Sequence, residues 1–293
     1  MIGRGGMSEV YRARHVHRAT THALKILDPR VYAGTGQRYQ QMLFARLRRE
    51  GRLQQEIRHP NIVHVEQVME TPHGPALLME WVDGPTLDAV LAARSALRWQ
   101  DVDDIAQGLL RALAGAQQAE VVHRDVKPSN VLLAREHGQW VPKLTDFGLA
   151  KDSDDVDDLT LTGQVMGTPG YMPPRQMQDA KHVDTSVDTY AMGAVLYEIA
   201  TGRRLVPVWQ RATPDLVACA LERLADTDVP VRMQLAIAMA LRPGLPRFDA
   251  ASVLAAWQGN APPNNPFPSW RPVAGFAVVG AFAALWWGLG ILG

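Results

Sequence analysis

The chain has 293 residues, of which 47% are apolar and 20% charged, a balance that suits a globular core and excludes a largely disordered chain. Lys and Arg number 30, as do Asp and Glu, so no overall positive field is present and we expect no nucleic-acid partner. Cys219 is the single cysteine, which excludes an intrachain disulfide and indicates a reducing compartment. The N-terminus is Gly-rich without an apolar segment, so no signal peptide is expected.

The first segment, "IGRGGMSEVY", places Gly3, Gly5 and Ser8 at the spacing G-x-G-x-x-G. Glycines in such a turn let backbone N–H groups close over phosphates without a side-chain clash. A dinucleotide-binding fold needs a helix directly afterwards, whereas "VYRARH" is typical of a strand. The segment therefore favours a phosphate-covering loop between strands.

Next, "THALKIL" predicts a strand that places Lys25 among apolar residues. A lysine there requires either solvent or an anionic partner. Residues 40–57 have helical spacing, and Glu50 within them is a candidate partner. An edge-strand lysine and a solvated glutamate remain as alternatives.

"ALLMEWV" predicts a buried strand, and residues 101–119 predict an amphipathic helix with Asp101 as its N-cap. Further along, "TYAMGAVLYEIATG" is apolar on nearly every side, which predicts a deeply buried helix that ends at Gly202 as its C-cap. The order is a strand-rich part followed by a helix-rich part.

The segment "VVHRDVKPSNVLL", residues 121–133, predicts a short polar loop between two buried strands. Asp125 can accept a proton from an attacking hydroxyl, and Lys127 can steady a transferring phosphoryl group. Asn130 offers an amide oxygen to a hard cation. Charged groups between apolar strands would be costly without such a use.

A second polar loop occurs in "KLTDFGLAK", residues 143–151. Asp146 suits Mg²⁺, Phe147 can pack inward, and Gly148 allows a sharp turn. Its position after the first loop strengthens the hypothesis of phosphoryl-transfer chemistry.

The C-terminal part has a different composition. Residues 259–272 contain five prolines and predict a stiff, extended linker. Residues 273–293 carry no charge and, as a helix, would be roughly 31 Å long, enough to span a bilayer. Arg271 precedes the span and no basic residue follows it, which places the preceding part in the cytoplasm. A buried terminal helix is the alternative.

These motifs together resemble those of the eukaryotic-like (Hanks-type) Ser/Thr protein kinases of bacteria, over residues 2 to about 258. The matching segments, in chain order, are "GRGGMSEVY", "HALKIL", Glu50, "HPNIV", "MEWVDGPTL", "HRDVKPSN", "DFG", "GTPGYM" and "DTYAMG".

The resemblance implies an α+β, bilobal protein-kinase fold that binds Mg-ATP between its lobes, with a C-terminal transmembrane helix. Residues 1–82 would form a small β-rich N-lobe with a truncated first strand, and residues 83–258 a larger helical C-lobe. The linker 259–272 would lead to the transmembrane helix 273–293.

The family roles carry over to matching positions. Lys25, held by Glu50, would bind phosphates, and Asp125 with Lys127 would serve catalysis. Asn130 and Asp146 would hold Mg²⁺, or Mn²⁺ in its place. Met79 would control the back of the nucleotide pocket. The positions implied for ATP binding are Ile2, Gly3, Gly5, Val10, Lys25, Glu80 and Val82, the last two through backbone groups.

The resemblance also implies control by phosphorylation. Thr168 would contact the catalytic loop, and Asp188 would hold the backbone of that loop. Arg124 would receive a phosphothreonine, with Thr160 and Thr162 as candidates. The acidic residues 152–158 are either a solvated loop or a source of a carboxylate that occupies the Arg124 site instead.

Four features depart from the family pattern. Arg175 stands where the family has Glu, and would face Arg247, the arginine with which that Glu normally pairs. Pro173 replaces Ala in the same motif. The first strand is truncated, which predicts an upstream start or a poorly supported cover over ATP. Gln54 occupies a position that is normally small or apolar.

None of these departures removes a group that touches ATP, Mg²⁺ or the transferred phosphate. We therefore expect ATP-dependent phosphorylation of Ser and Thr in proteins, with autophosphorylation of the activation segment. A membrane-anchored pseudokinase that binds nucleotide or partners is the alternative, and a kinase acting on a small molecule is a weaker one. The expected location is the cytoplasmic (inner) membrane, as a single-pass protein.

Partners expected are protein substrates and the membrane. A homodimer through the kinase domain or the transmembrane helix also remains open. In the latter case, Gly280, Ala284 and Gly288 would form a ridge of small residues for helix pairing.

Arg175 provides a test of the altered motif. If Arg247 is its neighbour, Arg175→Glu should raise the unfolding free energy by about 3 kcal/mol, because repulsion between guanidiniums becomes an ion pair. Thermal unfolding of both variants measures this change. An unchanged midpoint of thermal unfolding would mean that another group already pairs with Arg247.

Overall fold

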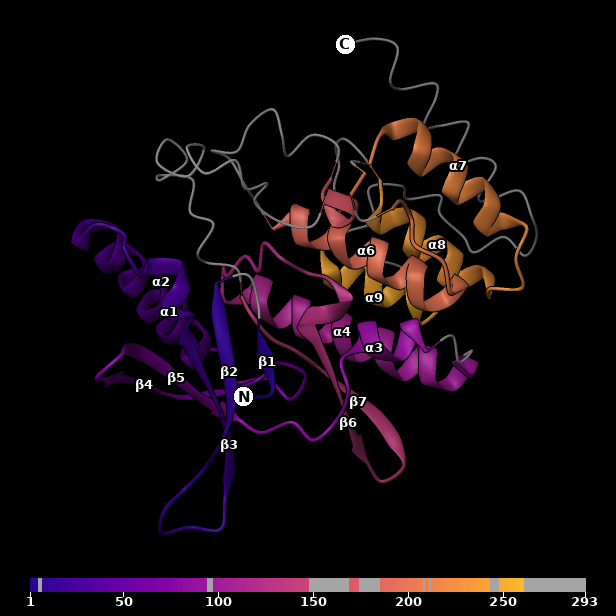
Figure 1. Cartoon of the computed structure of the whole chain (residues 1–293). Coiled ribbons are helices and arrows are strands. Elements are labelled where there is room, and N and C mark those ends of the chain that lie inside the picture. Colours follow the sequence, from indigo (N-terminus) through magenta and orange to yellow (C-terminus); the bar gives the residue numbers. More distant parts are fainter. Residues whose placement is uncertain are drawn as a thin grey trace.

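The computed structural model describes residues 1–4, 7–93, 97–147, 169–173, 185–207, 209–210, 212–242 and 248–260. Within these residues a strand-rich lobe precedes a helical lobe, as the sequence predicted (Figure 1). No helix in this part of the chain is long and apolar enough to cross a membrane. The predicted features that lie outside the described residues are Gly5, Gly148, Thr160, Thr162, Thr168, Arg175, Arg247, the acidic run 152–158, all but the start of the linker, and the span 273–293.

The first lobe contains an antiparallel sheet with the strand order β1-β2-β3-β5-β4. The strands are β1 (Gly3–Arg4), β2 (Ser8–Arg14), β3 (Thr21–Leu27), β4 (Val65–Thr71) and β5 (Gly74–Glu80). A short helix α1 (Pro29–Tyr32) and a long helix α2 (Gln37–Glu56) connect β3 to β4, and α2 packs against β4 and β5. A core of its own, which includes Leu43, Leu47 and Leu77, fills the space between helix and sheet.

The period of two in β3 accounts for the position of Lys25. Ala23, Lys25 and Leu27 are buried while the residues between them are half-buried, as expected for alternating faces of a strand. Lys25 therefore lies on the inner face of the sheet, where its ammonium group cannot reach bulk water freely.

The second lobe is mostly helical and has a larger core. Its elements are α3 (Leu87–Ala92), α4 (Trp99–Gln118), the 3₁₀ turn η1 (Pro128–Asn130), the hairpin β6 (Val131–Glu136) and β7 (Gln139–Leu144), the 3₁₀ turn η5 (Pro169–Tyr171), α6 (Ser186–Thr201), α7 (Pro214–Ala225), α8 (Val231–Ala240) and α9 (Ala250–Trp257). Helix α9 packs against both α4 and α8, and α6 also packs on α4 and α8.

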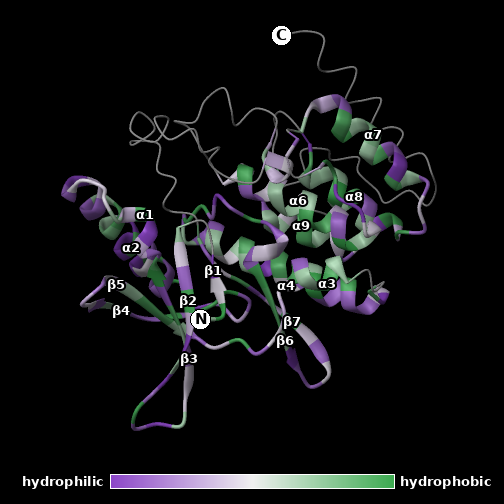
Figure 2. Ribbon diagram, viewed as in Figure 1, coloured by the Kyte–Doolittle hydropathy of each residue, from purple (hydrophilic) through white to green (hydrophobic). Residues whose placement is uncertain are grey.

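Helix α6 is buried along nearly its whole length, as its sequence predicted. Figure 2 shows hydrophobic residues gathered in α6, α8 and α9, whereas α2 is largely hydrophilic. Gly202 ends the helix with a φ of 66°, the left-handed conformation of a C-cap that glycine adopts without steric cost. The predicted C-cap is thus confirmed.

Two local predictions are wrong. Asp101 is not an N-cap, because α4 begins at Trp99 with Arg98 in the capping position. The Asp101 carboxylate instead accepts a hydrogen bond from Arg98 Nε at 2.8 Å. Val121 and Val122 do not form a strand before the polar loop, since the chain enters the loop directly from the end of α4.

The segment that follows α2 is bonded to the helical lobe. Val63 N–H donates to the Leu144 carbonyl at 2.9 Å, and Leu144 N–H donates to the Asn61 carbonyl at 2.8 Å. The Asn61 side chain donates to the Pro142 carbonyl at 2.9 Å. The C-terminal end of α2 is therefore fixed to β7, in the other lobe.

Gln54, near that end of α2, is 1% exposed although its side chain is polar. Its Nε2 donates a hydrogen bond to the Val63 carbonyl at 2.8 Å. An apolar residue would leave this carbonyl without that donor, so the departure from the family pattern has a structural use.

Replacement of Gln54 by Leu should therefore destabilise the protein by about 1–3 kcal/mol, because a buried acceptor loses its donor. Gln55→Leu is the matched control, since Gln55 makes the same type of bond, to the Glu66 carbonyl at 3.0 Å, in an exposed position. Its effect should stay within about 0.5 kcal/mol. Equal midpoints of denaturant unfolding for both variants would contradict the role of Gln54.

Candidate active site

Lys25 forms one of the contacts between the two lobes. Its Nζ lies 2.6 Å from Glu50 Oε1, on α2, and 3.1 Å from Asp146 Oδ1, in the loop after β7. The side chains of Lys25 and Glu50 are each 8% exposed, whereas that of Asp146 is 39% exposed. The structure thus brings together three of the predicted site residues, from a strand, a helix and a loop.

The electrostatics of this cluster keep Lys25 charged. Burial opposes the charge of the ammonium group, but the carboxylates of Asp146 and Glu50 outweigh burial and raise the pKa of Lys25 above its ordinary value. A fixed positive charge where a strand of one lobe meets the Asp146 loop of the other is suited to an anionic ligand such as phosphate.

The polar loop after α4 is organised around Asp125. Lys127 Nζ lies 2.7 Å from Asp125 Oδ2, and Asn130 Nδ2 donates to Asp125 Oδ2 at 3.1 Å and to its carbonyl at 2.8 Å. Thr145 N–H donates to the Asn130 carbonyl at 2.9 Å, which joins this loop to the segment that carries Asp146. The candidate residues of both motifs therefore lie in one connected site.

Asp188, on the buried helix α6, holds the backbone of this loop. Its two carboxylate oxygens accept hydrogen bonds from the N–H groups of His123 at 2.6 Å and Arg124 at 2.7 Å. Arg124 and Asp146 have φ values of 64° and 60°, a left-handed conformation that residues other than glycine rarely adopt. Such strain persists only where surrounding contacts determine the backbone, and it is frequent at functional sites.

His123 is a site residue that the sequence analysis did not single out. It is fully buried, its Nε2 lies 3.0 Å from the Thr145 carbonyl oxygen, and its ring centroid lies 4.4 Å from that of Phe147. Phe147 is also fully buried, as predicted. The sequence did hold a signal for His123: it directly follows two valines, and apolar neighbours in the chain indicate that the ring is buried as well.

Asn130 and Asp146 have the donor chemistry that Mg²⁺ prefers, namely an amide and a carboxylate oxygen. Since Asn130 uses its Nδ2 toward Asp125, its carbonyl oxygen Oδ1 is the atom suited to a cation. Among the described residues no group of three or more His, Cys, Asp or Glu side chains could hold a metal alone. The two residues therefore fit a Mg²⁺ ion, which would take its remaining ligands from phosphates and water.

The predicted nucleotide-binding positions that the structure describes in the first lobe lie in or next to β1, β2, β3 and β5. Val10 pairs with Lys25 across β2 and β3, so both side chains lie on the inner face. Met79 and Val82 are buried at the end of β5 and just beyond it.

Glu80 N–H donates to the His64 carbonyl at 3.0 Å, so this N–H is not available to a ligand. Ile2 is exposed, next to Gly3 at the start of β1.

Tyr171, in η5, is a second residue beyond those predicted. It lines a small cavity beside Asp125, together with Arg124 and Val126. Its hydroxyl donates to Glu198 Oε2 at 2.5 Å, and burial together with this bond raises the pKa of Tyr171. The segment next to the Asp125 loop is thus fixed to α6 through a buried carboxylate.

Comparison with known proteins agrees with this geometry. The family described as "Protein kinase domain" matches residues 1–235. The probable serine/threonine-protein kinase PknB of Bifidobacterium longum is 34% identical over 213 residues, which are 69% of this chain and 29% of that protein. Serine/threonine-protein kinase pkn3 of Myxococcus xanthus is 35% identical over 207 residues, 69% of this chain and 37% of that protein.

A longer match is to the serine/threonine-protein kinase PknB of Mycolicibacterium smegmatis, 33% identical over 241 residues, 78% of this chain and 35% of that protein. This chain thus aligns with about a third of the length of these relatives. The crystal structure of Rad53 residues 1–466 in complex with AMP-PNP has a similar fold, with a TM-score of 0.64 and 24% sequence identity over 86% of this chain and 62% of that one.

The resemblance to bacterial Hanks-type kinases that the motifs predicted is confirmed by these matches. With residues 1–235 matched and both loops assembled around Lys25, the chain belongs to the protein kinase family.

Proposed function

We propose that the chain is an ATP-dependent kinase that phosphorylates Ser and Thr hydroxyls of proteins. The observation that carries this proposal is the position of Lys25, which contacts Glu50 and Asp146 at once. This arrangement places a fixed cation, a candidate metal ligand and the Asp125 loop around one cleft. Phosphoryl transfer relies mainly on such positioning and on charge stabilisation.

In this proposal the nucleotide lies between the two lobes. Lys25 binds the phosphates while Glu50 holds its ammonium group in place. Val10 covers the base from above. The backbone carbonyl of Glu80 and the backbone of Val82 bind adenine, because the Glu80 N–H is already bonded to His64. Gly3 and Gly5 let the hairpin approach the phosphates closely.

Asp125 orients the substrate hydroxyl and accepts its proton as the oxygen attacks the γ-phosphorus, while the bond from this phosphorus to the β,γ-bridging oxygen breaks and ADP leaves. Lys127, 2.7 Å from the Asp125 carboxylate, neutralises charge that develops on the transferring group. Asn130 and Asp146 would hold Mg²⁺, which when bound supplies charge stabilisation for the phosphates. The presence of Lys25, Asp125 and Asp146 in one site supports this function over that of a pseudokinase.

The domain limits extend the proposal to the rest of the chain. Residues 1–82 act as the N-lobe and residues 83–258 as the C-lobe, followed by the linker 259–272. Residues 273–293 anchor the kinase to the cytoplasmic membrane, on the basis of their uncharged sequence. Dimerisation through the kinase domain or this anchor fits the same arrangement.

Replacement of Asp125 by Asn tests the catalytic role. The transfer of labelled phosphate from ATP should fall by about 10²- to 10⁴-fold, because Asn cannot accept the proton. Binding of ATP should persist, since Asp125 acts on the hydroxyl. Asp215→Asn, an exposed change in the first turn of α7, is the matched control and should leave transfer unchanged. Wild-type protein that binds ATP without transferring phosphate would favour the pseudokinase.

We also propose that a phosphothreonine at position 160 or 162 docks on Arg124 and activates the enzyme. Thr160→Ala combined with Thr162→Ala should then lower activity at least about tenfold, because the new charge-assisted hydrogen bonds cannot form. A kinase assay after phosphatase treatment of the wild type is the parallel measurement. Full activity of the double variant would instead favour a carboxylate of residues 152–158 at the Arg124 site.

A further inference from the structure

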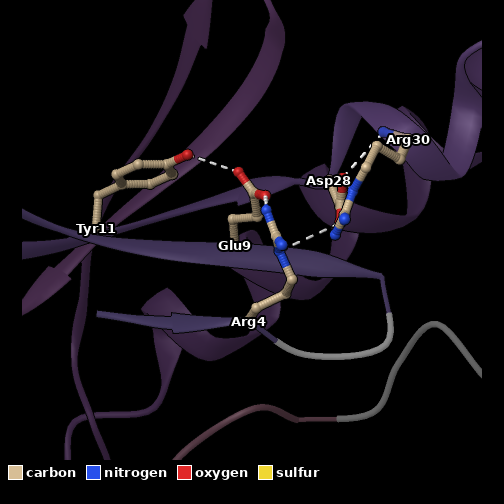
Figure 3. A network of polar contacts seen from close by, with 5 residues as sticks. All are labelled: Arg4, Glu9, Tyr11, Asp28 and Arg30. Carbon is tan, nitrogen blue, oxygen red and sulfur yellow. Dashed lines mark hydrogen bonds and ion pairs between the residues drawn. The ribbon is translucent and has the colours of Figure 1, made fainter. Parts of the chain in front are cut away.

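Strands β1 and β2 form a hairpin, which the proposed function places over the phosphates. A row of charged and polar side chains crosses the outer face of this hairpin (Figure 3). Glu9 lies at its centre: Arg4 Nε donates to Glu9 Oε1 at 3.0 Å and the Tyr11 hydroxyl donates to Glu9 Oε2 at 2.6 Å. Arg4 Nε also lies 3.7 Å from Asp28 Oδ2, and Asp28 accepts hydrogen bonds from Arg30 Nε at 3.0 and 3.1 Å. The row therefore joins β1, β2, the end of β3 and the start of α1.

The two carboxylates in this row are the buried members. The side chains of Glu9 and Asp28 are 7% and 5% exposed, whereas those of Arg4 and Arg30 are 43% and 64% exposed. Hydrogen bonds from Tyr11 and Arg4 lower the pKa of Glu9, and those from Arg30 lower the pKa of Asp28 to about 2. Both carboxylates are therefore charged at neutral pH and depend on their partners.

Strand alternation places Arg4, Glu9 and Tyr11 on the face of the sheet opposite Lys25. Val10 and Lys25 are cross-strand partners on the inner face. Glu9 and Tyr11 flank Val10 in β2 and so project to the other face, where Arg4 is the direct cross-strand partner of Glu9. The Arg4 guanidinium is thus engaged on the outside of the hairpin, away from the side that faces a nucleotide.

The Asp28 end of the row is fixed to the rest of the strand-rich lobe. Asp28 is the N-cap of α1, and its backbone N–H donates to the Met7 carbonyl at 2.9 Å, within the hairpin loop. Tyr32, at the end of α1, packs edge-on against Phe44 of α2 with ring centroids 5.4 Å apart. Among the described residues, β1 pairs with β2 at Gly3–Val10 and Arg4–Glu9, and Ile2 N–H donates to the Val10 carbonyl at 2.8 Å. The side-chain contacts of Glu9 add to this short backbone attachment.

We propose that Glu9 is a positioning residue for phosphate binding: through Arg4 and Tyr11 it holds the hairpin against the junction of β3 and α1. The inference rests on the proposed function, because it assigns to the hairpin the task of covering the phosphates. Loss of the Glu9 charge lets the hairpin move away from the phosphates, while groups that bind adenosine stay in place.

Binding of Mg·AMP-PNP and of adenosine to the full-length chain, measured by calorimetry, tests this role. Glu9→Gln keeps the shape of the side chain and removes its charge. It should weaken AMP-PNP binding by about tenfold, the effect of one or two charge-assisted hydrogen bonds. Adenosine binding should change less than about twofold. In the kinase assay, KM for ATP should rise while kcat at saturating ATP is retained.

Tyr11→Phe is the second variant, since it removes one donor to Glu9 and preserves the ring; it should shift the AMP-PNP affinity in the same direction by a smaller factor. Glu70→Gln is the control: its carboxylate pairs with Arg48 at 2.6 Å between β4 and α2, apart from the hairpin. This variant should keep the wild-type ratio of AMP-PNP to adenosine affinity.

Three results would overturn the proposal or its premise, and they are distinguishable. Equal weakening of AMP-PNP and adenosine by Glu9→Gln would mean that Glu9 acts only on overall stability. Tighter AMP-PNP binding by Glu9→Gln would mean that freed Arg4 is itself a phosphate ligand. Wild-type protein that binds neither compound would contradict the proposed kinase function instead.

Discussion

The buried ammonium group of Lys25 is the constraint on which the other parts of the site depend. A cation on the inner face of a sheet is costly to bury, and two carboxylates, from α2 and from the loop after β7, compensate for it. Removal of one partner from a buried pair typically costs about 3–5 kcal/mol. The pair therefore fixes the position of α2 against the sheet and draws the Asp146 loop toward the strand-rich lobe.

Much of the fold could be predicted from patterns that report burial. Strand β3 was predicted with its observed limits, because apolar residues cluster on both sides of Lys25. The helix ending at Gly202 was predicted because a continuous apolar run needs a position surrounded by protein. Boundaries set by polar side chains were harder, since Asp101 can cap a helix or, as the structure has it, pair with Arg98 inside the first turn.

In the candidate site, too, some features could be predicted from the sequence and others could not. The types of residue in the two polar loops predicted their chemistry, because few other uses justify so many charges beside a core. The hydrogen-bond partners of the residues that support the site could not be predicted in this way. Nothing in the sequence indicates that Gln54 donates to the Val63 carbonyl, or that Glu9 is held by Arg4 and Tyr11, because these contacts depend on how elements are placed in space.

The attachment of the segment after α2 has a mechanical consequence. Residues 61–63 are bonded to β7 in the helical lobe, and Glu80, at the end of β5, forms an ion pair with Lys143 at 2.9 Å beside them. The body of α2 packs on β4 and β5, while its C-terminal end is tied through Gln54 to Val63, next to the bonds with the helical lobe. A shift between the two lobes would therefore load the same helix that carries Glu50, and with it the ion pair to Lys25.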